Sequence, residues 1–388
     1  MKVCFETFGC RLNKAEALQM EAEYLAKGWE TTRTHKDADL FVVRGCSVTR
    51  RAQEDCEKLI AHLRHRYPAK VIRVCGCLPQ ATRSKTREDS EPDEVPVPIR
   101  TARAYLKVQD GCAGKCTFCI VPKFRGSSKS VDFVRVLDQA KRFVDAGYHE
   151  IVVTGCNLAL YSSQGKRLHD LLLALADIDA GCRIRLGSVE PEIGTLETVR
   201  AMSERPNICR FLHLPIQSGA NRILKAMCRP YLVHDVDEVI STATALMPNL
   251  GLGCDLMTGF PDESELDFTA TVGLLKRFPF SKAHVFPYSR RPGTPAAGFP
   301  NQIARTVKTT RARQLTEAAL AARQKFAQSF IGKTVELVIE DAQKVSGWTG
   351  EYLPCKIEGA VVPRKKLVRA RVYNVKGDLL RAHLIKEK

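Results

Sequence analysis

Six short apolar runs, each followed by a helical pattern, constrain the fold of residues 104–290 more than any other feature of this chain. They are AYLKVQ (104–109), EIVVTG (150–155), RIRLGSVEP (183–191), FLHLPI (211–216), GCDLMTGF (253–260) and KAHVFPY (282–288). Alternation of strand and helix predicts an α/β fold with a parallel sheet. Because six units are too few for a closed eight-stranded barrel, we expect a partial (βα)6 barrel, with its function at the carboxyl ends of the strands.

Two further domains are expected on either side of this barrel. Residues 1–80 contain three strand-like runs, KVCFETFG, DLFVVRG and KVIRVCGC, and predict a small α/β domain, followed by a polar, proline-punctuated linker over residues 81–100. A long helix over Thr306–Phe330 completes the barrel domain, residues 101–331. The tail, residues 332–388, contains the runs VELVIED, GEYLPCKIEG, LVRARVYNV and LLRAHLI, which predict a small antiparallel β-barrel of the RNA-binding kind. Alternatively, the tail only packs against the larger barrel.

The charge of the chain favours a polyanionic partner. A formal net charge of +17 over 388 residues suits phosphate binding, although a solvated basic surface would give the same value. The tail contributes Arg364, Lys365, Lys366, Arg369 and Arg371 to this charge. No run of about 18 apolar residues and no signal-peptide pattern occur, so we expect a cytoplasmic protein with no membrane partner. Fifteen cysteines in such a protein suit iron–sulfur ligation better than disulfides.

Three cysteines in the string QDGCAGKCTFCIVP follow the first predicted barrel strand. Cys112, Cys116 and Cys119 have the spacing C-x3-C-x2-C, and three thiolates on one tight loop can ligate three irons of a cubane cluster. The fourth iron then stays open for a substrate or cofactor. A zinc knuckle with a distant fourth ligand, or three unrelated core thiols, would be the bland alternatives. The spacing resembles that of the radical S-adenosylmethionine (SAM) superfamily, which implies that the open iron binds SAM.

A second set of cysteines, Cys10, Cys46 and Cys77, falls directly after the three strand-like runs of the first domain. Parallel strands could therefore deliver three thiols to one sheet edge. The surrounding words ETFGCRLNKAEA, RGCSVTRRAQ and CGCLPQ resemble the three cysteine boxes of the radical SAM methylthiotransferase family. Its barrel motifs are resembled, in the same order, by QDGCAGKCTFCIVPKFRG, RIRLGSVEP, HLPIQSGANRILKAMCRPY, LMTGFPDESELDF and HVFPYSRRPGTPAA.

This resemblance implies two 4Fe–4S clusters and SAM as cofactors. Cys10, Cys46 and Cys77 would hold an auxiliary cluster that carries the inserted sulfur, and Cys112, Cys116 and Cys119 the SAM-binding cluster. The protein would position reactants while the cofactors perform the difficult steps. Residues at predicted strand ends are expected to bind SAM, although each could instead be a turn or packing residue: Gly155, Glu190, Gln217 and Ser218. An electron donor such as flavodoxin or ferredoxin and a tRNA are the implied partners.

Among the subclasses of the family, four words look most like the one that methylthiolates N6-threonylcarbamoyladenosine beside the tRNA anticodon: GCRLNKAEA, CSVTRRAQ, HVFPYSRRPGTPAA and GWTGEYLPCKI. The last of these words is similar to a stretch of the RNA-binding TRAM barrel. Alternatives are the subclasses acting on isopentenyladenosine in tRNA or on a ribosomal-protein aspartate. A single-cluster radical SAM enzyme without sulfur insertion and an RNA-binding protein with a structural cluster also stay open.

The chain departs from the family pattern in four places. After Cys77 the sequence passes almost directly into the polar linker, so the first domain looks truncated and the auxiliary site less enclosed. Arg44 and Gly45 replace the usual residues before Cys46, and Asp262 replaces a glycine. Cys75 lies two residues before Cys77 and competes with it as a ligand.

Overall fold

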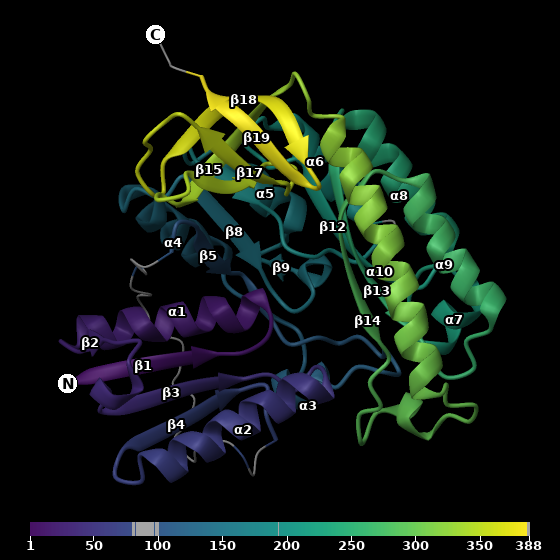
Figure 1. Ribbon diagram of the computed structural model, residues 1–388, viewed down its shortest axis with the longest axis horizontal. Coiled ribbons are helices and arrows are strands. Elements are labelled where there is room, and N and C mark those ends of the chain that lie inside the picture. The colour runs from purple at the N-terminus through teal and green to yellow at the C-terminus, as the bar shows by residue number, and fades with distance from the viewer. Residues whose placement is uncertain (80–81, 83–96, 98–100, 193, 386–388) are drawn as a thin grey trace.

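The three strand-like runs of the N-terminal region form one parallel sheet. In the computed structural model, which describes residues 1–79, 82, 97, 101–192 and 194–385, the strand order is β2-β1-β3-β4 (Figure 1). The strands are β1 (Lys2–Thr7), β2 (Glu30–Thr31), β3 (Leu40–Gly45) and β4 (Val71–Gly76). Helix α1 (Arg11–Ala26) covers one face and α2 (Arg50–Arg66) the other. Every residue of β3 is buried because both faces of the sheet are covered.

All six predicted barrel strands are present, in the predicted order, and all run parallel. One sheet contains β5 (Ala104–Lys107), β8 (Glu150–Thr154) and β11 (Arg183–Arg185), and the other contains β12 (Phe211–Gln217), β13 (Gly251–Thr258) and β14 (Phe280–Pro287). A parallel bridge between Ser188 and His213 continues the first sheet into the second. No pairing joins β5 to β14 within the described residues, so the barrel is open on one side. The predicted (βα)6 architecture is confirmed.

Helices cover the outer face of this barrel (Figure 1). They are α4 (Phe133–Asp145), α5 (Leu168–Ala176), α6 (Thr195–Glu204), α7 (Asn221–Ala226), α8 (Val233–Leu246), α9 (Glu265–Arg277) and the long α10 (Arg305–Gln328). Helix α4 begins where the Asp132 carboxylate accepts hydrogen bonds from two backbone N–H groups of the first turn. Val136, Ala140 and Phe143, which recur at helical spacing on one face of α4, are buried in the core.

The tail forms a closed five-stranded barrel in the order β15-β16-β17-β19-β18. Its strands are β15 (Thr334–Asp341), β16 (Ser346–Thr349), β17 (Pro354–Glu358), β18 (Leu367–Lys376) and β19 (Leu379–Leu384). The small barrel is confirmed, with one difference from the expected antiparallel pattern. Strand β17 pairs with β19 in parallel, since the chain crosses over between β17 and β18 and leaves β17 beside the strand after next.

The small barrel covers the amino ends of the (βα)6 strands. Phe211, the first residue of β12, stacks on Tyr352 with ring centroids 4.6 Å apart. Arg185 of β11 donates to the Thr349 carbonyl at 2.8 Å. A Cβ on Gly251, the first residue of β13, would lie 2.2 Å from the Glu351 carbonyl oxygen. The tail therefore closes the end of the barrel opposite the cysteine loop.

The predicted linker, residues 81–100, lies almost entirely outside the described residues, as does the region where the first domain looks truncated. Within the described part of the chain, no helix is both long and apolar enough to cross a membrane.

Candidate active site

Cys10, Cys46 and Cys77 lie at one edge of the N-terminal sheet, where β1, β3 and β4 end. Because these neighbouring strands are parallel, their carboxyl ends meet at the same edge. Gly9 has a φ of 95°, and a Cβ there would lie 2.6 Å from the Cys46 Cβ, so glycine permits the close approach of two cysteine loops. Burial, with contributions from the Cys10 and Cys77 thiols, raises the pKa of Cys46 to about 11. The three thiols are therefore near enough to influence one another.

The neighbouring Cys75 faces a different environment. Its Sγ lies 3.7 Å from Nη1 of Arg44, under helix α1, where Arg44 also forms a buried ion pair with Glu16. The Cys77 Sγ instead faces Arg125 of the barrel domain at 2.9 Å. This geometry favours Cys77 over Cys75 as the third thiol of the set.

Cys112, Cys116 and Cys119 lie on one loop between β6 (Gln109–Asp110) and α3 (Val121–Arg125). Strand β6 pairs with β7 (Lys129–Ser130), which closes the base of the loop. The backbone N–H of Gly114 donates to the Cys112 Sγ at 3.3 Å. A Cβ on Gly114 would lie 3.2 Å from the Cys112 Sγ and 3.8 Å from the Cys116 Sγ, so the loop wraps its thiols around a glycine. Such a cradle of thiolate donors suits a cluster.

A largely apolar cavity of about 280 Å³ lies between the two cysteine sets. Val48 and Thr49 line it from the loop after Cys46, and Cys119 lines it from the barrel loop. The remaining lining comes mostly from the carboxyl ends of β12, β13 and β14 and includes Gln217, Asp255, Met257, Phe286 and Tyr288. The predicted functional end of the barrel thus faces the cysteine edge of the N-terminal sheet.

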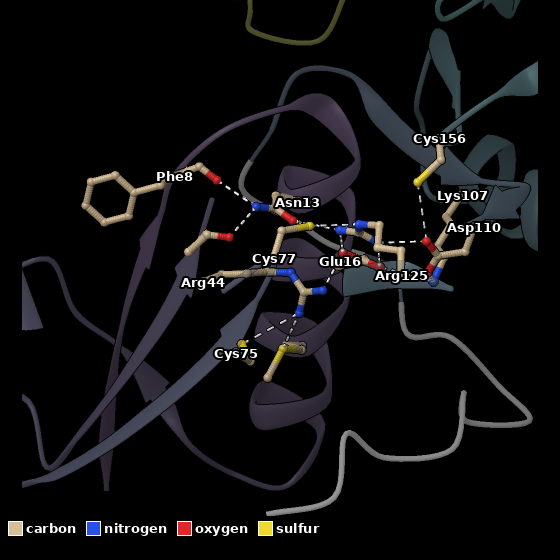
Figure 2. A network of polar contacts seen from close by, with 12 residues as sticks. Phe8, Asn13, Glu16, Arg44, Cys75, Cys77, Lys107, Asp110, Arg125 and Cys156 are labelled. Atoms are coloured by element: carbon tan, nitrogen blue, oxygen red, sulfur yellow. Dashed lines mark hydrogen bonds and ion pairs between the residues drawn. The ribbon is translucent and has the colours of Figure 1, made fainter. Parts of the chain in front are cut away.

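One guanidinium joins the two halves of this site. Arg125, six residues after Cys119, donates from Nε to the Cys77 Sγ at 2.9 Å and from Nη2 to the Asn13 Oδ1 at 2.8 Å. It also forms ion pairs with Glu16 at 2.9 Å and Asp110 at 2.8 Å. Figure 2 shows Arg125 between α1 of the N-terminal unit and the first barrel strand region. Arg125 thus donates five hydrogen bonds, the number of its N–H groups. These bonds fix the spacing of the two cysteine sets.

A second arginine, Arg229, contacts the loop that carries Cys112, Cys116 and Cys119. Arg229 donates from Nη1 to the Cys116 Sγ at 2.9 Å and from Nε to the Tyr231 hydroxyl at 2.8 Å. Its Nη2 forms an ion pair with Glu190, one of the predicted SAM-binding residues. Burial raises the pKa of Glu190 to about 7 in spite of this partner. The structure thus places Glu190 one side chain away from the Cys116 thiol.

The other three residues expected to bind SAM differ in their surroundings. Gln217 lines the cavity, has a φ of 68°, and its buried Oε1 has no hydrogen-bond partner within the described residues. Such an orphaned acceptor beside a cavity suits a polar ligand. The buried Ser218 hydroxyl instead accepts from the Ala220 backbone N–H at 3.2 Å, inside the turn. At Gly155, a Cβ would lie 2.9 Å from the Gln109 Oε1, so this glycine packs against the Gln109 side chain. Gln109 donates to the Gly111 carbonyl of the cysteine loop and accepts from the Asn157 N–H after β8, and so joins the two segments.

Sequence reasoning alone did not single out Arg125, Arg229, Asn13 or Glu16. All four lie inside words quoted for the family resemblance, which was the signal available. Their roles depend on contacts between segments as many as 113 residues apart in sequence.

Comparison with protein families matches residues 106–275 to the radical SAM superfamily and residues 2–96 to the family described as UPF0004. The threonylcarbamoyladenosine tRNA methylthiotransferase MtaB of Bacillus subtilis is 30% identical over 421 aligned residues, covering 95% of this chain and 93% of the relative. MtaB of Aquifex aeolicus is 31% identical, covering 92% of this chain and 97% of the relative. This chain belongs to the radical SAM tRNA methylthiotransferase family. The recognition of the family from its cysteine boxes and barrel motifs is confirmed.

Solved structures support the fold of this methylthiotransferase. The radical SAM methyltransferase TsrM of Kitasatospora setae, solved with cobalamin and a [4Fe–4S] cluster, has a TM-score of 0.54 at 11% identity. The match covers 76% of each chain. At this identity the likeness speaks for the fold alone.

Members of the family use SAM and two 4Fe–4S clusters, and the methylthiotransferase has donor sets that fit them: two groups of three thiols and an orphaned amide oxygen beside the cavity between them. When bound, these groups supply the one-electron and sulfur chemistry. The protein's own residues would orient these groups and enclose them. Arg125 and Arg229 each direct an N–H toward one thiol, which counteracts the effect of burial on the pKa of Cys77 and Cys116. Met257 and Phe286 give the cavity apolar walls, which disfavour water beside a bound reactant.

Proposed function

We propose that this enzyme methylthiolates N6-threonylcarbamoyladenosine next to the anticodon of tRNA, giving the 2-methylthio derivative. The observation that carries this proposal is the agreement among relatives named for that substrate. Those of Bacillus subtilis, Aquifex aeolicus and Thermotoga maritima are 29–31% identical over 92–100% of this chain. The first cysteine box, with Arg11 after Cys10, points to the same substrate.

The assignment of the clusters is part of the proposal. Cys10, Cys46 and Cys77 hold the auxiliary cluster, supported by their common sheet edge and by the Gly9 contact. Cys112, Cys116 and Cys119 hold the SAM-binding cluster on their closed loop. Gln217 and Glu190 contact SAM, the first from the cavity wall and the second beside Arg229.

Mass spectrometry of tRNA nucleosides tests the substrate. A strain that lacks the modification should gain 2-methylthio-threonylcarbamoyladenosine when it expresses this chain. Cys112→Ser and Cys10→Ser should abolish the product, whereas Cys228→Ser, which changes an exposed thiol outside both sets, should not. Loaded enzyme should contain about eight irons per chain, and about four would contradict the auxiliary cluster.

A second substrate has support from two relatives. The tRNA-2-methylthio-N6-dimethylallyladenosine synthases of Aquifex aeolicus and Agrobacterium fabrum are 28% identical to this chain. Appearance of the methylthiolated isopentenyl nucleoside, without the threonylcarbamoyl product, would replace the proposed substrate with this one.

A further inference from the structure

Polar side chains, rather than aliphatic ones, occupy the part of the (βα)6 barrel lumen that lies towards the small β-barrel. Successive residues of a strand point to opposite faces, and Leu212, Leu214, Leu252, Cys254 and Leu256 pack outward in the main core. The alternate positions His213 of β12, Asp255 of β13, and Lys282 and His284 of β14 therefore face the lumen. Ligand atoms of His213, Asp255 and His284 all lie within 4.8 Å of one another. His284 is exposed, Asp255 is partly buried and His213 is buried.

Positive charge exceeds negative charge in this part of the lumen. Arg11, which follows Cys10, places its guanidinium 5.2 Å from the centre of the Tyr352 ring, and Lys282 places its ammonium 4.3 Å from the same ring. Neither side chain forms an ion pair with a carboxylate within the described residues. Asp255 is the acidic member of the group, and Arg185, also over Tyr352, is already paired with Glu150. Two cations thus lie near one carboxylate, and Lys282 is also hydrogen-bonded to the Tyr352 hydroxyl.

The ionisation of the surrounding groups reflects this excess. Although burial opposes it, the charges of Arg11 and Lys282 lower the pKa of Tyr352 to about 7. Burial, together with Lys282 and Arg11, lowers the pKa of His284 to about 4, and the pKa of His213 is lowered in the same direction. Both histidines are therefore neutral at physiological pH and act as hydrogen-bonding groups.

Two ligand types have the right chemistry in principle. Two histidines and one carboxylate within 4.8 Å resemble a divalent-metal site. The neighbouring guanidinium and ammonium, however, repel a metal cation and attract an anion. Asp255 also lines the cavity between the two cysteine sets, so this residue belongs both to the lumen group and to the cavity wall.

We propose that Arg11 and Lys282 form a carboxylate pocket in the barrel lumen that binds the threonyl carboxylate of the tRNA nucleoside and excludes a nucleoside with an uncharged isoprenoid group on the same nitrogen. This inference rests on the proposed function and identifies the residues that decide between its two candidate substrates. Neutral His284 supplies a hydrogen bond to the polar remainder of the substituent, whereas the buried His213 is hydrogen-bonded through Nδ1 to the Ser188 hydroxyl. The carboxylate accepts charge-assisted hydrogen bonds from both cations and takes the place of the Tyr352 hydroxyl as the partner of Lys282.

A change in the substrate tests the pocket without altering the protein. The loaded wild-type enzyme is given one tRNA with threonylcarbamoyladenosine and the same tRNA with the methyl ester of its threonyl carboxylate. The ester removes the negative charge and adds one methyl group, and the Lys282 variant described below separates the effect of charge from that of size. We expect kcat/KM for methylthiolation to fall by about tenfold to a hundredfold, the range for a lost hydrogen bond to a charged group. Equal values for acid and ester would overturn the proposal.

Two variants and a matched control test whether Arg11 and Lys282 cause the preference for the acid over the ester. Arg11→Gln and Lys282→Met should each weaken the preference for acid over ester, measured both as kcat/KM and as tRNA binding. Lys14→Gln removes the same charge from the same helix but outside the lumen, where Lys14 lies exposed over Tyr105, and should keep the preference. Because Arg11 adjoins Cys10, iron content is measured in each variant, and Lys282→Met carries the test if Arg11→Gln loses iron. An unchanged preference in Lys282→Met would refute the pocket.

The outcomes separate this inference from the proposed function. If the wild-type enzyme methylthiolates the isopentenyl nucleoside and ignores the threonylcarbamoyl one, the proposed function fails. If it methylthiolates the threonylcarbamoyl nucleoside and its ester equally well, only the pocket fails.

Discussion

The Nε of Arg125 donates a hydrogen bond to the Sγ of Cys77 at 2.9 Å, across the junction between the barrel domain and the N-terminal sheet. The same guanidinium is ion-paired with Glu16, which Arg44 and Lys107 also contact. One buried carboxylate thus holds three cations from three segments of the chain. These side-chain contacts therefore hold the two cysteine sets at a fixed distance from each other.

Replacing Arg125 with Met should destabilise the protein by about 3–5 kcal/mol, because it breaks a buried ion-pair network and leaves groups without partners. Denaturant unfolding of the cluster-free protein measures this change. Arg313→Met is the matched control: it removes an exposed i,i+4 pair with Glu317 and should cost well under about 1 kcal/mol. Similar losses for both variants would contradict the role of the network.

Tyr352 should ionise near neutral pH, since Arg11 and Lys282 lower its pKa to about 7. The folded-state pKa lies below the unfolded value of about 10, so this group adds stability as pH rises from about 7 to about 10 and adds none below about 7. The difference in tyrosinate absorbance between wild type and Tyr352→Phe gives the titration. In Lys282→Met the midpoint should move upward, and an unchanged midpoint would show that the lumen charge does not act on Tyr352.

Gly251→Ala should loosen the contact between the two barrels. Its Cβ would lie 2.2 Å from the backbone oxygen of Glu351, and backbone cannot move aside as a flexible side chain can. We expect a loss of unfolding free energy of at least about 1 kcal/mol, the lower end of the range for overpacking. Gly273→Ala, in helix α9 with no atom within 4 Å of the added Cβ, should instead stabilise by about 0.5–1 kcal/mol. Thermal unfolding compares the two.

The exposed face of β18 should contribute to tRNA binding. Arg369 and Arg371 are both exposed and alternate on the same face of the strand. Changing each to Gln should weaken tRNA binding and reduce the salt dependence of log K by about one for each phosphate group that the variant no longer neutralises. Filter binding at several salt concentrations measures the slope, with Arg313→Gln as the control. If neither variant alters the slope, the tail serves only to close the larger barrel.

The strands and their cysteines could be read from the sequence because strand and helix periodicities are local signals of which face is buried. All six barrel strands follow from such patterns. Strand β16 was missed for a local reason: it is four residues long and contains Gly347, whose Cβ would lie 2.0 Å from the Val338 carbonyl oxygen. In a sequence, a glycine that close strand packing requires cannot be told apart from a glycine that marks a turn.

The sequence by itself determined the family, the order of the elements and the delivery of two cysteine sets to strand ends. Only the tertiary structure decided what lies between them. The contacts of Arg125 with Glu16 and of Arg229 with Cys116 join segments more than a hundred residues apart, and the charges of Arg11 and Lys282 meet over a tyrosine of the tail. Periodicity reports whether a residue is buried. It does not report which distant side chain completes its hydrogen bonds or balances its charge, because those partners are set by how the sheets and barrels pack together.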